Sequence, residues 1–446
     1  MVGGDAGGMG AASQARRLRP DLEIIALEKS AWTSYSACGI PYLVGGEIKD
    51  FDELVTRSPQ EFRDTFRIDV RVRHEAMALD LDRREVEVRD HEGDRTLRIG
   101  FDQLVIGTGA RPVRPSLPGI DQECVVGVQT LGDAEVLLGL AERFRAKQVV
   151  VVGAGYIGLE IAEAFLRRGA EVAVVERSPQ VMGTLDADMA ALVERAMRGE
   201  GIDLRLGVST TGFEPGVAHT DAGDLPADLV VLALGVRPNS ELAGDAGLAL
   251  GAGDAIVVDR RQRTGVDGVW AAGDCCESHH LVTGRKVHVA LGTVATKQSR
   301  VAGTNIGGGY ATFPGVVGTA ATRLCDTEVA RTGLNEAEAT ADGFRFHAVT
   351  VESTTQAGYL PSAKAITVKL LAEQRSGKLL GGQIVGQQGS AKRIDVLATA
   401  LHAEMSVEEM TQLDLSYAPP FGPVWDPVLI AARKATEAVA KGLAGP

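Results

Sequence analysis

The sequence KQVVVVGAGYIGLEIAEAFLRRGAEVAVVERSP, residues 147–179, decides the fold class of this chain. Its apolar run Val149–Val152 predicts a strand that is buried on both faces. A glycine pattern G-x-G-x-x-G follows, then a helical pattern that stops at Gly169, then a second strand, Glu171–Val175, that ends on Glu176. A strand, a glycine turn, a helix, a strand and a terminal acid predict a βαβ unit that binds a dinucleotide. A tight turn without a ligand would leave Glu176 unexplained.

The acidic residue at the end of this unit bears on the choice of nicotinamide cofactor. Glu176 is expected to accept a hydrogen bond from the adenosine ribose 2′-hydroxyl and to repel a 2′-phosphate. NADH is therefore slightly favoured over NADPH, although the neighbouring Arg177 offers a partner for the extra phosphate of NADPH.

The N-terminal sequence VGGDAGGMGAASQARRLRPDLEIIALEKS, residues 2–30, is similar to a second copy of this unit. It has glycines near its start, a helical run to Arg19 and a strand, Glu23–Leu27, that ends on Glu28. Asp5 stands where the middle glycine is expected. Only two residues precede the first glycine, so we expect that the true start of this strand lies upstream. Two dinucleotide folds in one chain indicate a flavin together with a nicotinamide.

Composition restricts the remaining possibilities. The chain of 446 residues has a net charge of −13, with 45% apolar and 24% charged residues. These values predict a globular protein of roughly two to four domains and argue against a general binder of nucleic acid or membrane surfaces. No apolar run is long enough to span a membrane, and no signal peptide is visible. Five cysteines without disulfide or metal-ligand spacing favour the reducing cytoplasm and predict no metal site.

Three further apolar strands run into glycine-containing turns. Residues 104–115 and 229–239 each contain a Gly-x-Arg-Pro sequence, which we interpret as a turn. Residues 265–277 predict a strand that leads into Asp274, whose carboxylate is suited to accept from flavin ribityl hydroxyls or to cap a helix. From Gly318 onward, strand-like runs rich in threonine and valine are followed by helical segments, which predicts a separate α+β domain.

The motifs are, in chain order, G-G-x-A-x-G, S-x-x-x-C-G-x-P-Y, T-G-A-R-P, V-G-x-G-Y-I-G-x-E, A-L-G-V-R-P-N, A-A-G-D-C, L-G-T and L-D-L-S-Y-A-P-P-F. Together they resemble the flavoprotein pyridine nucleotide–disulfide oxidoreductase superfamily, and within it the single-cysteine branch of coenzyme A-disulfide reductases, NADH oxidases and persulfide reductases. The resemblance implies an α/β fold similar to glutathione reductase, with two Rossmann-like dinucleotide-binding domains and a C-terminal α+β dimerisation domain. The implied limits are 1–112 with 246–320 for a split FAD domain, 113–245 for the NAD(P)H domain and 321–446 for the dimerisation domain.

The resemblance also implies the cofactors and the residues that bind them. FAD is expected at Gly3, Gly8, Glu28, Thr108, Gly109 and Asp274. NADH or NADPH is expected at Gly153, Gly155, Tyr156, Ile157, Gly158 and Glu176, and Gly235 is also assigned to cofactor binding. A homodimer is expected, in which the C-terminal domain of one subunit completes the active site of its partner.

The sequence SYSACGIPYLVGG, residues 34–46, holds the candidate redox residue, Cys38. Glutathione reductase-type enzymes carry Cys-x4-Cys, but the second position here is Leu43. Without a local resolving thiol, the oxidised state of Cys38 must be a mixed disulfide, a persulfide or a sulfenic acid. A helix expected over residues 39–44, with Pro41 in its first turn, would lower the pKa of the thiol. The alternative is a buried structural cysteine, which is how we interpret the other four cysteines.

The resemblance distinguishes among these oxidised states. Ala6 occupies the position at which peroxidase and water-forming oxidase members carry a histidine that stabilises the sulfenic acid, so a thiol–disulfide cycle is favoured. Tyr359 and Tyr417 match tyrosines that coenzyme A-disulfide reductases supply from the partner subunit. A phenol there can hydrogen-bond or protonate the leaving thiolate. Packing at the interface is the other interpretation of these two tyrosines.

Residues implied to bind the substrate are Gln14, Arg17, Ser34 and Arg300. Arginine binds phosphate through paired hydrogen bonds, although a solvated basic helix face would show the same pattern. Ala37 replaces the family's asparagine just before the cysteine, which is a departure from the coenzyme A-binding pattern.

The expected activity is the reduction of a low-molecular-weight disulfide or persulfide by NAD(P)H through FAD and Cys38, with the disulfide or persulfide of coenzyme A favoured. Two alternatives remain open. One is an NADH oxidase that reduces oxygen at the flavin, and the other is a flavin-binding redox sensor or electron-transfer module.

Overall fold

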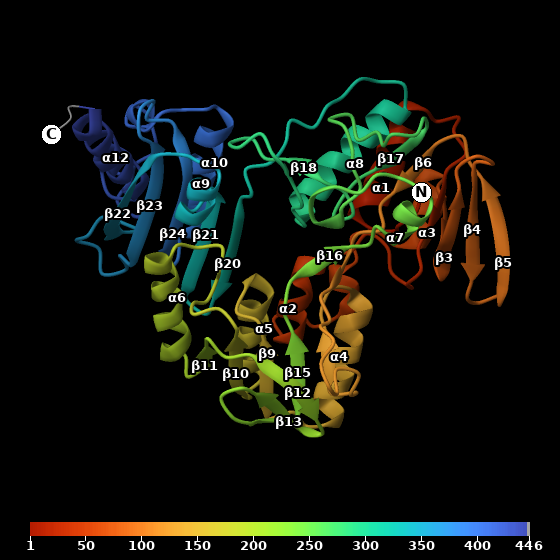
Figure 1. The fold of residues 1–446 in the computed structure, drawn as a ribbon, viewed down its shortest axis with the longest axis horizontal. Coiled ribbons are helices and arrows are strands. Elements are labelled where there is room, and N and C mark those ends of the chain that lie inside the picture. Colours follow the sequence, from red (N-terminus) through yellow and green to blue (C-terminus); the bar gives the residue numbers. More distant parts are fainter. Residues whose placement is uncertain (444–446) are drawn as a thin grey trace.

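The computed structural model describes residues 1–443 and shows three bodies (Figure 1). The N-terminal body contains the parallel pairs β1 (Ile25–Leu27) with β2 (Asp69–Arg71) and β6 (Leu104–Ile106) with β17 (Val269–Ala271). Val2 joins these pairs into one sheet, because it forms bridges with both Leu27 and Ile106. The sequence analysis expected most of the strand before Gly3 to be missing, and in the structure Val2 alone takes its place between the two pairs.

Two long helices of the N-terminal body, α1 (Ala6–Leu18) and α8 (Gly292–Ile306), lie side by side (Figure 1). Glycines allow their close approach: a methyl group at Gly303 would lie 2.4 Å from the carbonyl oxygen of Ala11. This body also contains the antiparallel sheet of β3 (His74–Asp80), β4 (Glu85–Asp90) and β5 (Arg95–Gly100), the antiparallel pair β18 (Ser278–His279) and β19 (Lys286–Val287), and the helices α3 (Pro59–Phe66) and α7 (Glu241–Asp245).

The middle body is a parallel sheet with helices packed on one face and a small antiparallel sheet packed on the other. Its strands, in spatial order, are β11 (Asp203–Leu206), β10 (Glu171–Glu176), β9 (Gln148–Val152), β15 (Leu229–Leu232) and β8 (Val125–Gly127). Val149–Val152 are buried, which confirms the strand predicted from their apolar run. The helices are α4 (Leu131–Arg143), α5 (Tyr156–Arg167) and α6 (Ala187–Gly199), and β12 (Thr210–Glu214), β13 (Gly216–Thr220) and β14 (Leu225–Ala227) form a small antiparallel sheet.

The chain passes from the N-terminal body to the middle body and back through two segments, and these two segments pair with each other. β7 (Ala110–Pro112) and β16 (Val236–Pro238) form an antiparallel two-stranded ladder in which Arg111 lies opposite Arg237. The sequence interpretation of both Arg-Pro segments as turns was therefore wrong. Each segment turns at its glycine, Gly109 or Gly235, where φ is positive, and then extends because the other crossing supplies a partner strand.

The C-terminal body is an antiparallel sheet with helices. Its strand order is β20 (Ala320–Leu324), β21 (Thr327–Gly333), β24 (Leu379–Gly386), β23 (Ala365–Glu373) and β22 (Phe346–Thr354). The helices are α9 (Glu336–Ala341), α10 (Ile394–His402), α11 (Val407–Met410) and α12 (Pro427–Leu443). Helix α12 packs against β22 and β23. The predicted α+β character of this part is confirmed, whereas the predicted domain limits remain predictions.

A buried lysine ties the C-terminal body to the middle body. The side chain of Lys369 is 4% exposed, and its Nζ lies 3.1 Å from Asp186, 2.7 Å from Asp188 and 2.5 Å from Glu336. Three carboxylates around one ammonium satisfy the charge that burial would otherwise penalise.

No helix within residues 1–443 is both long and apolar enough to cross a membrane. The same described residues contain no cluster of three histidine, cysteine or acidic side chains arranged to hold a metal ion.

Candidate active site

The N-terminal glycine loop is built by close backbone contacts. Gly3 has φ +113°, and a methyl group on it would lie 2.0 Å from the carbonyl oxygen of Gly107. A methyl group on Gly8 would lie 2.0 Å from the carbonyl oxygen of Gly3. The Glu28 carboxylate accepts hydrogen bonds from the backbone N–H of Gly4 (2.8 Å) and of Ser30 (2.7 Å). This cradle, with an acid fixed at its edge, fits the adenosine end of a dinucleotide such as FAD.

Asp5 occupies the middle of this loop. It precedes α1 and accepts a hydrogen bond from the backbone N–H of Tyr35 at 3.2 Å. Burial raises the pKa of Asp5 to about 6, and the nearby carboxylates Glu28 and Asp274 add to this rise. The loop therefore carries an acid that holds its proton in mildly acidic solution.

The second glycine loop, in the middle body, has the same plan. Gly153 has φ +108°, and a methyl group on Gly158 would lie 2.0 Å from its carbonyl oxygen. Glu176 accepts from the backbone N–H of Ala154 (2.9 Å) and of Ser178 (2.7 Å). Nothing lies within 4 Å of the position that a methyl group on Gly155 would occupy, so the centre of this loop is open.

Tyr156 and Ile157 begin helix α5 directly after the loop. Both side chains pack against the apolar core of the middle body. The Tyr156 hydroxyl is buried and has no hydrogen-bond partner among residues 1–443.

Thr108 and Gly109 meet the second crossing between the bodies. The Thr108 hydroxyl donates to the backbone carbonyl of Asn239 at 2.5 Å, and the Asn239 side-chain amide donates back to the carbonyl of Thr108 at 2.9 Å. Sequence reasoning named Thr108 and Gly109 but missed Asn239, although Asn239 ends the quoted A-L-G-V-R-P-N motif.

Asp274 lies on a turn whose backbone is held from two sides. The Gln298 side chain, 0% exposed, accepts from the backbone N–H of Gly273 at 2.9 Å. His288 Nε2 lies 2.7 Å from the Asp274 carbonyl oxygen. The Asp274 carboxylate accepts no hydrogen bond from a described residue, and burial raises its pKa against the opposing effect of His288. Gln298 and His288 were missed, because only the fold brings α8 and residue 288 to this turn.

Cys38 lies in a single turn of 3-10 helix, Ala37–Gly39, immediately before α2 (Ile40–Val44). The predicted helix with Pro41 in its first turn is confirmed. The predicted lowering of the Cys38 pKa is wrong. Although Cys38 is exposed at the surface, the protein atoms around its sulfur desolvate the thiolate and raise the pKa of this thiol, and the carboxylates of Glu160, Asp274 and Asp5 raise it further. A helix of five residues offers little positive potential against three acids.

The other thiols are less accessible than Cys38. Cys124, Cys275 and Cys276 are buried and Cys325 is partly buried, whereas Cys38 is exposed. Leu43, at the position of the missing second cysteine, is 4% exposed and packs in the core. The alternative that Cys38 is a buried structural cysteine does not fit its exposure.

Glu160 is a residue near Cys38 that sequence reasoning missed. It lies on α5, and its carboxylate accepts from the Thr322 hydroxyl of β20 at 2.9 Å. Burial raises the pKa of Glu160. Pro41 and Tyr42 line a small cavity together with Glu160. The signal was present, because Glu160 is the final residue of the V-G-x-G-Y-I-G-x-E motif.

Tyr359 and Tyr417 lie on two loops of the C-terminal body that pack together. The Ala357 backbone N–H donates to the Pro419 carbonyl at 3.0 Å, and the Gln356 side chain donates to the Pro420 carbonyl at 2.8 Å. Tyr359 is 75% and Tyr417 is 49% exposed. No hydrogen bond or ion pair between described residues connects either tyrosine to Cys38.

The residues expected to bind substrate are partly brought together. Gln14 donates to the Thr304 hydroxyl at 3.1 Å and accepts from Arg17 at 3.5 Å. Ser34 lies at the N-terminal end of α1, because its backbone N–H donates to the Gly4 carbonyl at 2.9 Å. Arg300 is exposed on α8 and bonds to none of the other three.

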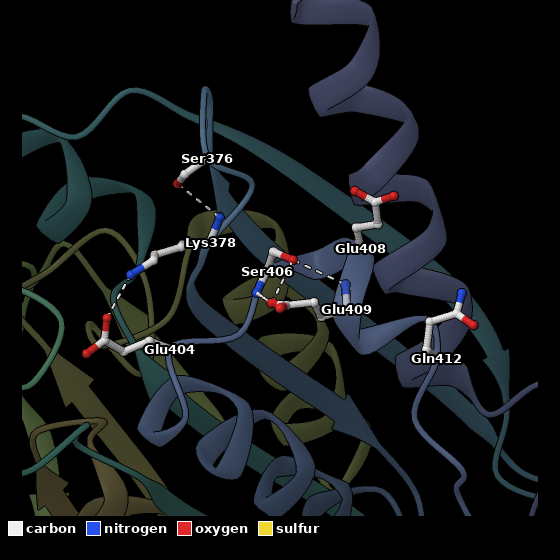
Figure 2. Close-up of a pocket in the computed structure, with 7 residues that line it drawn as sticks. All are labelled: Ser376, Lys378, Glu404, Ser406, Glu408, Glu409 and Gln412. Carbon is white, nitrogen blue, oxygen red and sulfur yellow. Dashed lines mark hydrogen bonds and ion pairs between the residues drawn. The ribbon is translucent and has the colours of Figure 1, made fainter.

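A hollow in the surface of the C-terminal body is formed by residues of another kind (Figure 2). Its Glu409 accepts from the Ser406 backbone at 2.8 Å and Ser406 accepts from the Glu409 backbone at 3.2 Å, which caps helix α11. Lys378 pairs with Glu404 at 2.7 Å. These polar groups form hydrogen bonds and an ion pair with one another, and we assign no catalytic or binding role to this hollow.

A protein family described as pyridine nucleotide-disulphide oxidoreductase matches residues 1–299, and the dimerisation domain of the same family matches residues 319–427. The chain belongs to this family. Its resemblance to the superfamily, inferred from the motifs, is therefore confirmed, and so is the α/β fold with a C-terminal dimerisation domain.

Several relatives of this pyridine nucleotide-disulphide oxidoreductase match it over nearly its full length. It is 36% identical over 438 residues to the NAD(P)H sulfur oxidoreductase (CoA-dependent) of Pyrococcus abyssi, with 97% of each chain covered. It is 35% identical over 440 residues to an NADH oxidase of Methanocaldococcus jannaschii, with 98% of each covered. The structure of an NAD-dependent persulfide reductase from A. fulgidus is 39% identical with a TM-score of 0.96, covering 99% of this chain and 83% of that one.

These likenesses support NAD(P)H oxidoreductase activity for this member of the pyridine nucleotide-disulphide oxidoreductases. Membership implies FAD together with NAD(P)H. The dimerisation domain supports a homodimer.

Proposed function

We propose that this chain reduces a low-molecular-weight disulfide or persulfide with NAD(P)H, using FAD and the single redox cysteine Cys38. The observation that carries the proposal is the exposed thiol of Cys38 with buried Leu43 in place of a second cysteine. A thiol without a resolving partner in its own chain segment can complete a redox cycle by exchange with a sulfur of the substrate.

FAD is proposed to lie against the N-terminal glycine loop, because the residues there fit it. Gly3 and Gly8 allow the close backbone contacts that shape the loop, Glu28 is fixed for the ribose, and the unpartnered Asp274 carboxylate is available to the ribityl chain. When bound, FAD supplies the transfer of two electrons from NAD(P)H to sulfur. Asn239, Gln298 and His288 hold the backbone of the turns around this site.

The sulfur chemistry proposed for Cys38 balances as follows. The Cys38 thiolate attacks one sulfur of the substrate RSSR, the S–S bond breaks, and RS⁻ leaves from a Cys38–S–SR mixed disulfide. Two electrons and one proton then return Cys38 to the thiolate and release RSH. With a proton taken up by RS⁻, the sum is RSSR + NAD(P)H + H⁺ → 2 RSH + NAD(P)⁺. Because the raised pKa of Cys38 limits the thiolate fraction, the first step is expected to accelerate with rising pH.

Coenzyme A is the favoured carrier of the substrate sulfur. Gln14 and Arg17 form a hydrogen-bonded pair on α1, whose N-terminal end adjoins the Cys38 segment. A relative named as CoA-dependent matches the chain at 36% identity. Ser34 and Arg300 are proposed to assist, and NADH is favoured because both oxygens of Glu176 are fixed by backbone donors.

A homodimer with shared active sites completes the proposal. Large apolar side chains are exposed on the loops that carry the two tyrosines: Tyr359 (75%), Tyr417 (49%), Phe421 (75%), Val424 (69%) and Trp425 (48%). A second copy covering this surface would bury it and would bring Tyr417 and Tyr359 to the Cys38 of its partner. A phenol at that position can donate a proton to the leaving thiolate.

Purified, FAD-loaded enzyme with Cys38→Ser tests this function against Cys325→Ser as the matched cysteine control. Coenzyme A disulfide, coenzyme A persulfide and glutathione disulfide are offered with NADH. We expect Cys38→Ser to lose at least 10³-fold in rate on the best substrate, because the nucleophile is gone, while NADH still bleaches the flavin absorbance. Disulfide reduction at the wild-type rate by Cys38→Ser would show that the proposal is wrong.

An NADH oxidase reducing oxygen at the flavin is the second candidate, favoured by the relative of that name in Methanocaldococcus jannaschii. It predicts steady oxygen consumption without any thiol and unchanged by Cys38→Ser. No NADH turnover with any disulfide or with oxygen would instead favour a redox sensor or electron-transfer module.

A further inference from the structure

Asp5 is the residue at which the N-terminal loop departs from the G-x-G-x-x-G pattern. Its backbone is extended, with φ −117°, so its conformation does not call for a glycine. Asp5 is also the N-cap residue of α1, a position at which an aspartate ordinarily accepts a hydrogen bond from the first turn of its helix. Its side chain makes no such capping hydrogen bond. The carboxylate instead holds a different segment of the chain.

That segment leads into Cys38. The Asp5 Oδ1 accepts a hydrogen bond from the backbone N–H of Tyr35 at 3.2 Å. The carbonyl of the preceding residue, Gly4, accepts from the backbone N–H of Ser34 at 2.9 Å. Two consecutive residues of the glycine loop therefore bind two consecutive N–H groups of the segment that carries the redox cysteine.

The same segment is held from a second side. The backbone N–H of Thr56 donates to the Ser34 carbonyl at 2.8 Å. Between these contacts Ser34 has φ +49°, a left-handed conformation that a residue other than glycine keeps only where its surroundings impose it. Among the hydrogen bonds described for this segment, that of Asp5 alone comes from a side chain. A substitution of Asp5 can therefore remove one contact and leave the backbone contacts in place.

Asp5 also acts on Cys38 through its charge. The carboxylates of Glu160, Asp274 and Asp5 each raise the pKa of the Cys38 thiol. They lie on three different elements: α5, the turn after β17 and the loop before α1. A negative charge near a thiol favours the protonated form, because the thiolate would repel it.

The groups that face Asp5 do not neutralise it. Glu28, at the end of β1, and Asp274 are carboxylates and add to the rise in the pKa of Asp5, which is about 6. Burial raises the pKa of the Tyr35 phenol above its ordinary value, so this phenol stays neutral. No lysine, arginine or histidine of residues 1–443 forms an ion pair with Asp5. At neutral and higher pH, Asp5 therefore carries a negative charge without a positive partner.

We propose that Asp5 is a positioning residue of the redox site: its carboxylate holds the Cys38 segment against the N-terminal glycine loop, and its negative charge opposes ionisation of the Cys38 thiol. This role rests on the proposed function in taking Cys38 as the reacting thiol, but it concerns the thiol before any substrate has bound. The two effects have different requirements. The hydrogen bond needs an acceptor oxygen, which asparagine also offers, whereas the electrostatic effect needs the charge.

The charge is tested by alkylation of Cys38 with iodoacetamide, followed by mass spectrometry on reduced, FAD-loaded protein from about pH 6.5 to 10. Asp5→Asn removes the charge, Glu160→Gln removes another facing charge without altering the Tyr35 bond, and the exposed Asp121→Asn is the control. We expect the first two to move the midpoint of the pH–rate curve downward, so that alkylation near neutral pH is about three- to tenfold faster. A midpoint in Asp5→Asn equal to that of the control overturns the proposal.

The hydrogen bond is tested by amide hydrogen exchange at Tyr35 in the same protein. Asp5→Gly removes the acceptor and is expected to speed this exchange about tenfold or more, the effect of losing one hydrogen bond to a charged group. Asp5→Asn keeps an acceptor and is expected to stay within about threefold of wild type, as is Glu160→Gln. Exchange at the wild-type rate in Asp5→Gly overturns the proposal.

Neither measurement depends on turnover. If the wild-type enzyme reduces no disulfide or persulfide with NADH, the proposed function has failed, and alkylation and amide exchange still decide the role of Asp5. If it does reduce one, the same two results apply unchanged.

Discussion

The two glycine loops of this chain have nearly the same backbone, although they lie in different bodies. φ is +113° at Gly3 and +108° at Gly153. A methyl group on Gly8 or on Gly158 would lie 2.0 Å from the carbonyl oxygen of the first glycine of its own loop. The first and last glycines are therefore required by contacts within the protein, before any ligand is considered.

The two loops differ at their central position. Gly155 has open space around it, whereas the N-terminal loop carries the buried Asp5 at this position. Because the central residue is extended in both loops, with φ −117° at Asp5 and −87° at Gly155, the fold does not require a central glycine. Only the approach of a ligand to the backbone can require it, and the two loops differ in the charge that they present there.

The largest expected effect comes from breaking the feature that the loops share. Gly8→Val and Gly158→Val place side chains against backbone carbonyls that cannot yield, so each is expected to lower the free energy of unfolding by about 3 kcal/mol or more. Gly8→Val should lose FAD while NADH still binds, and Gly158→Val should do the reverse. Urea unfolding, flavin absorbance and NADH titration measure these effects. Wild-type stability in both variants would contradict the close contacts.

The acid in the N-terminal loop predicts a pH dependence that the second loop lacks. The pKa of Asp5 is about 6 in the folded protein against 3.8 as its ordinary value, so the folded state binds more protons between these pH values. Stability therefore falls as pH rises from about 4 to about 6 and is level above, by about 2–3 kcal/mol in all. Asp5→Asn removes this fall, and its advantage over wild type in urea midpoint should be full above pH 6 and absent below pH 4. The exposed Asp121→Asn serves as the control, and a parallel pair of curves for wild type and Asp5→Asn would contradict the prediction.

The two acids at the edges of the loops should respond alike. Glu28 and Glu176 each accept two backbone hydrogen bonds, and a glutamine can accept only one of them. Glu28→Gln and Glu176→Gln are each expected to lose about 2 kcal/mol of stability, the scale of a hydrogen bond to a charged group. Cofactor titrations should show FAD weakened in the first and NADH weakened relative to NADPH in the second. Effects of very different size would show that the similar geometry conceals different functions.

The smallest expected change in stability comes from making the loops alike. Gly155→Asp copies the acid of the N-terminal loop into an open position with φ −87°, so stability should stay within about 0.5 kcal/mol of wild type. The new carboxylate is expected to weaken NADH binding about tenfold by repelling its phosphates. Gly155→Ala is the matched control and should leave both quantities near wild type. Unchanged NADH affinity in Gly155→Asp would place the pyrophosphate elsewhere.

Local patterns accounted for most of what was predicted correctly. The strand at Val149–Val152, the helix with Pro41 and the acids Glu28 and Glu176 each follow from residues within about 30 positions of one another. Such features depend on apolar periodicity and glycine geometry, which a single segment displays.

The failures concern groups that are distant in the sequence. The ladder of β7 and β16 joins residues more than 120 positions apart, so neither Arg-Pro segment shows alone that it will be a strand. The pKa of Cys38 depends on Glu160, Asp274 and Asp5, which come from three different elements. Tyr359 and Tyr417 remain predictions, because their proposed role requires a second copy of the chain.

The pairing of β7 with β16 has a consequence for how the molecule is assembled. The middle body enters and leaves the N-terminal body at one point, through Ala110–Pro112 and Val236–Pro238. In the N-terminal body, the segment between these strands is therefore a long insertion, and the pairing of β7 with β16 holds its two ends together. We expect the middle body to be exchangeable at this ladder for that of a relative only if the new body also matches helix α2 and the C-terminal sheet, against which the middle body packs.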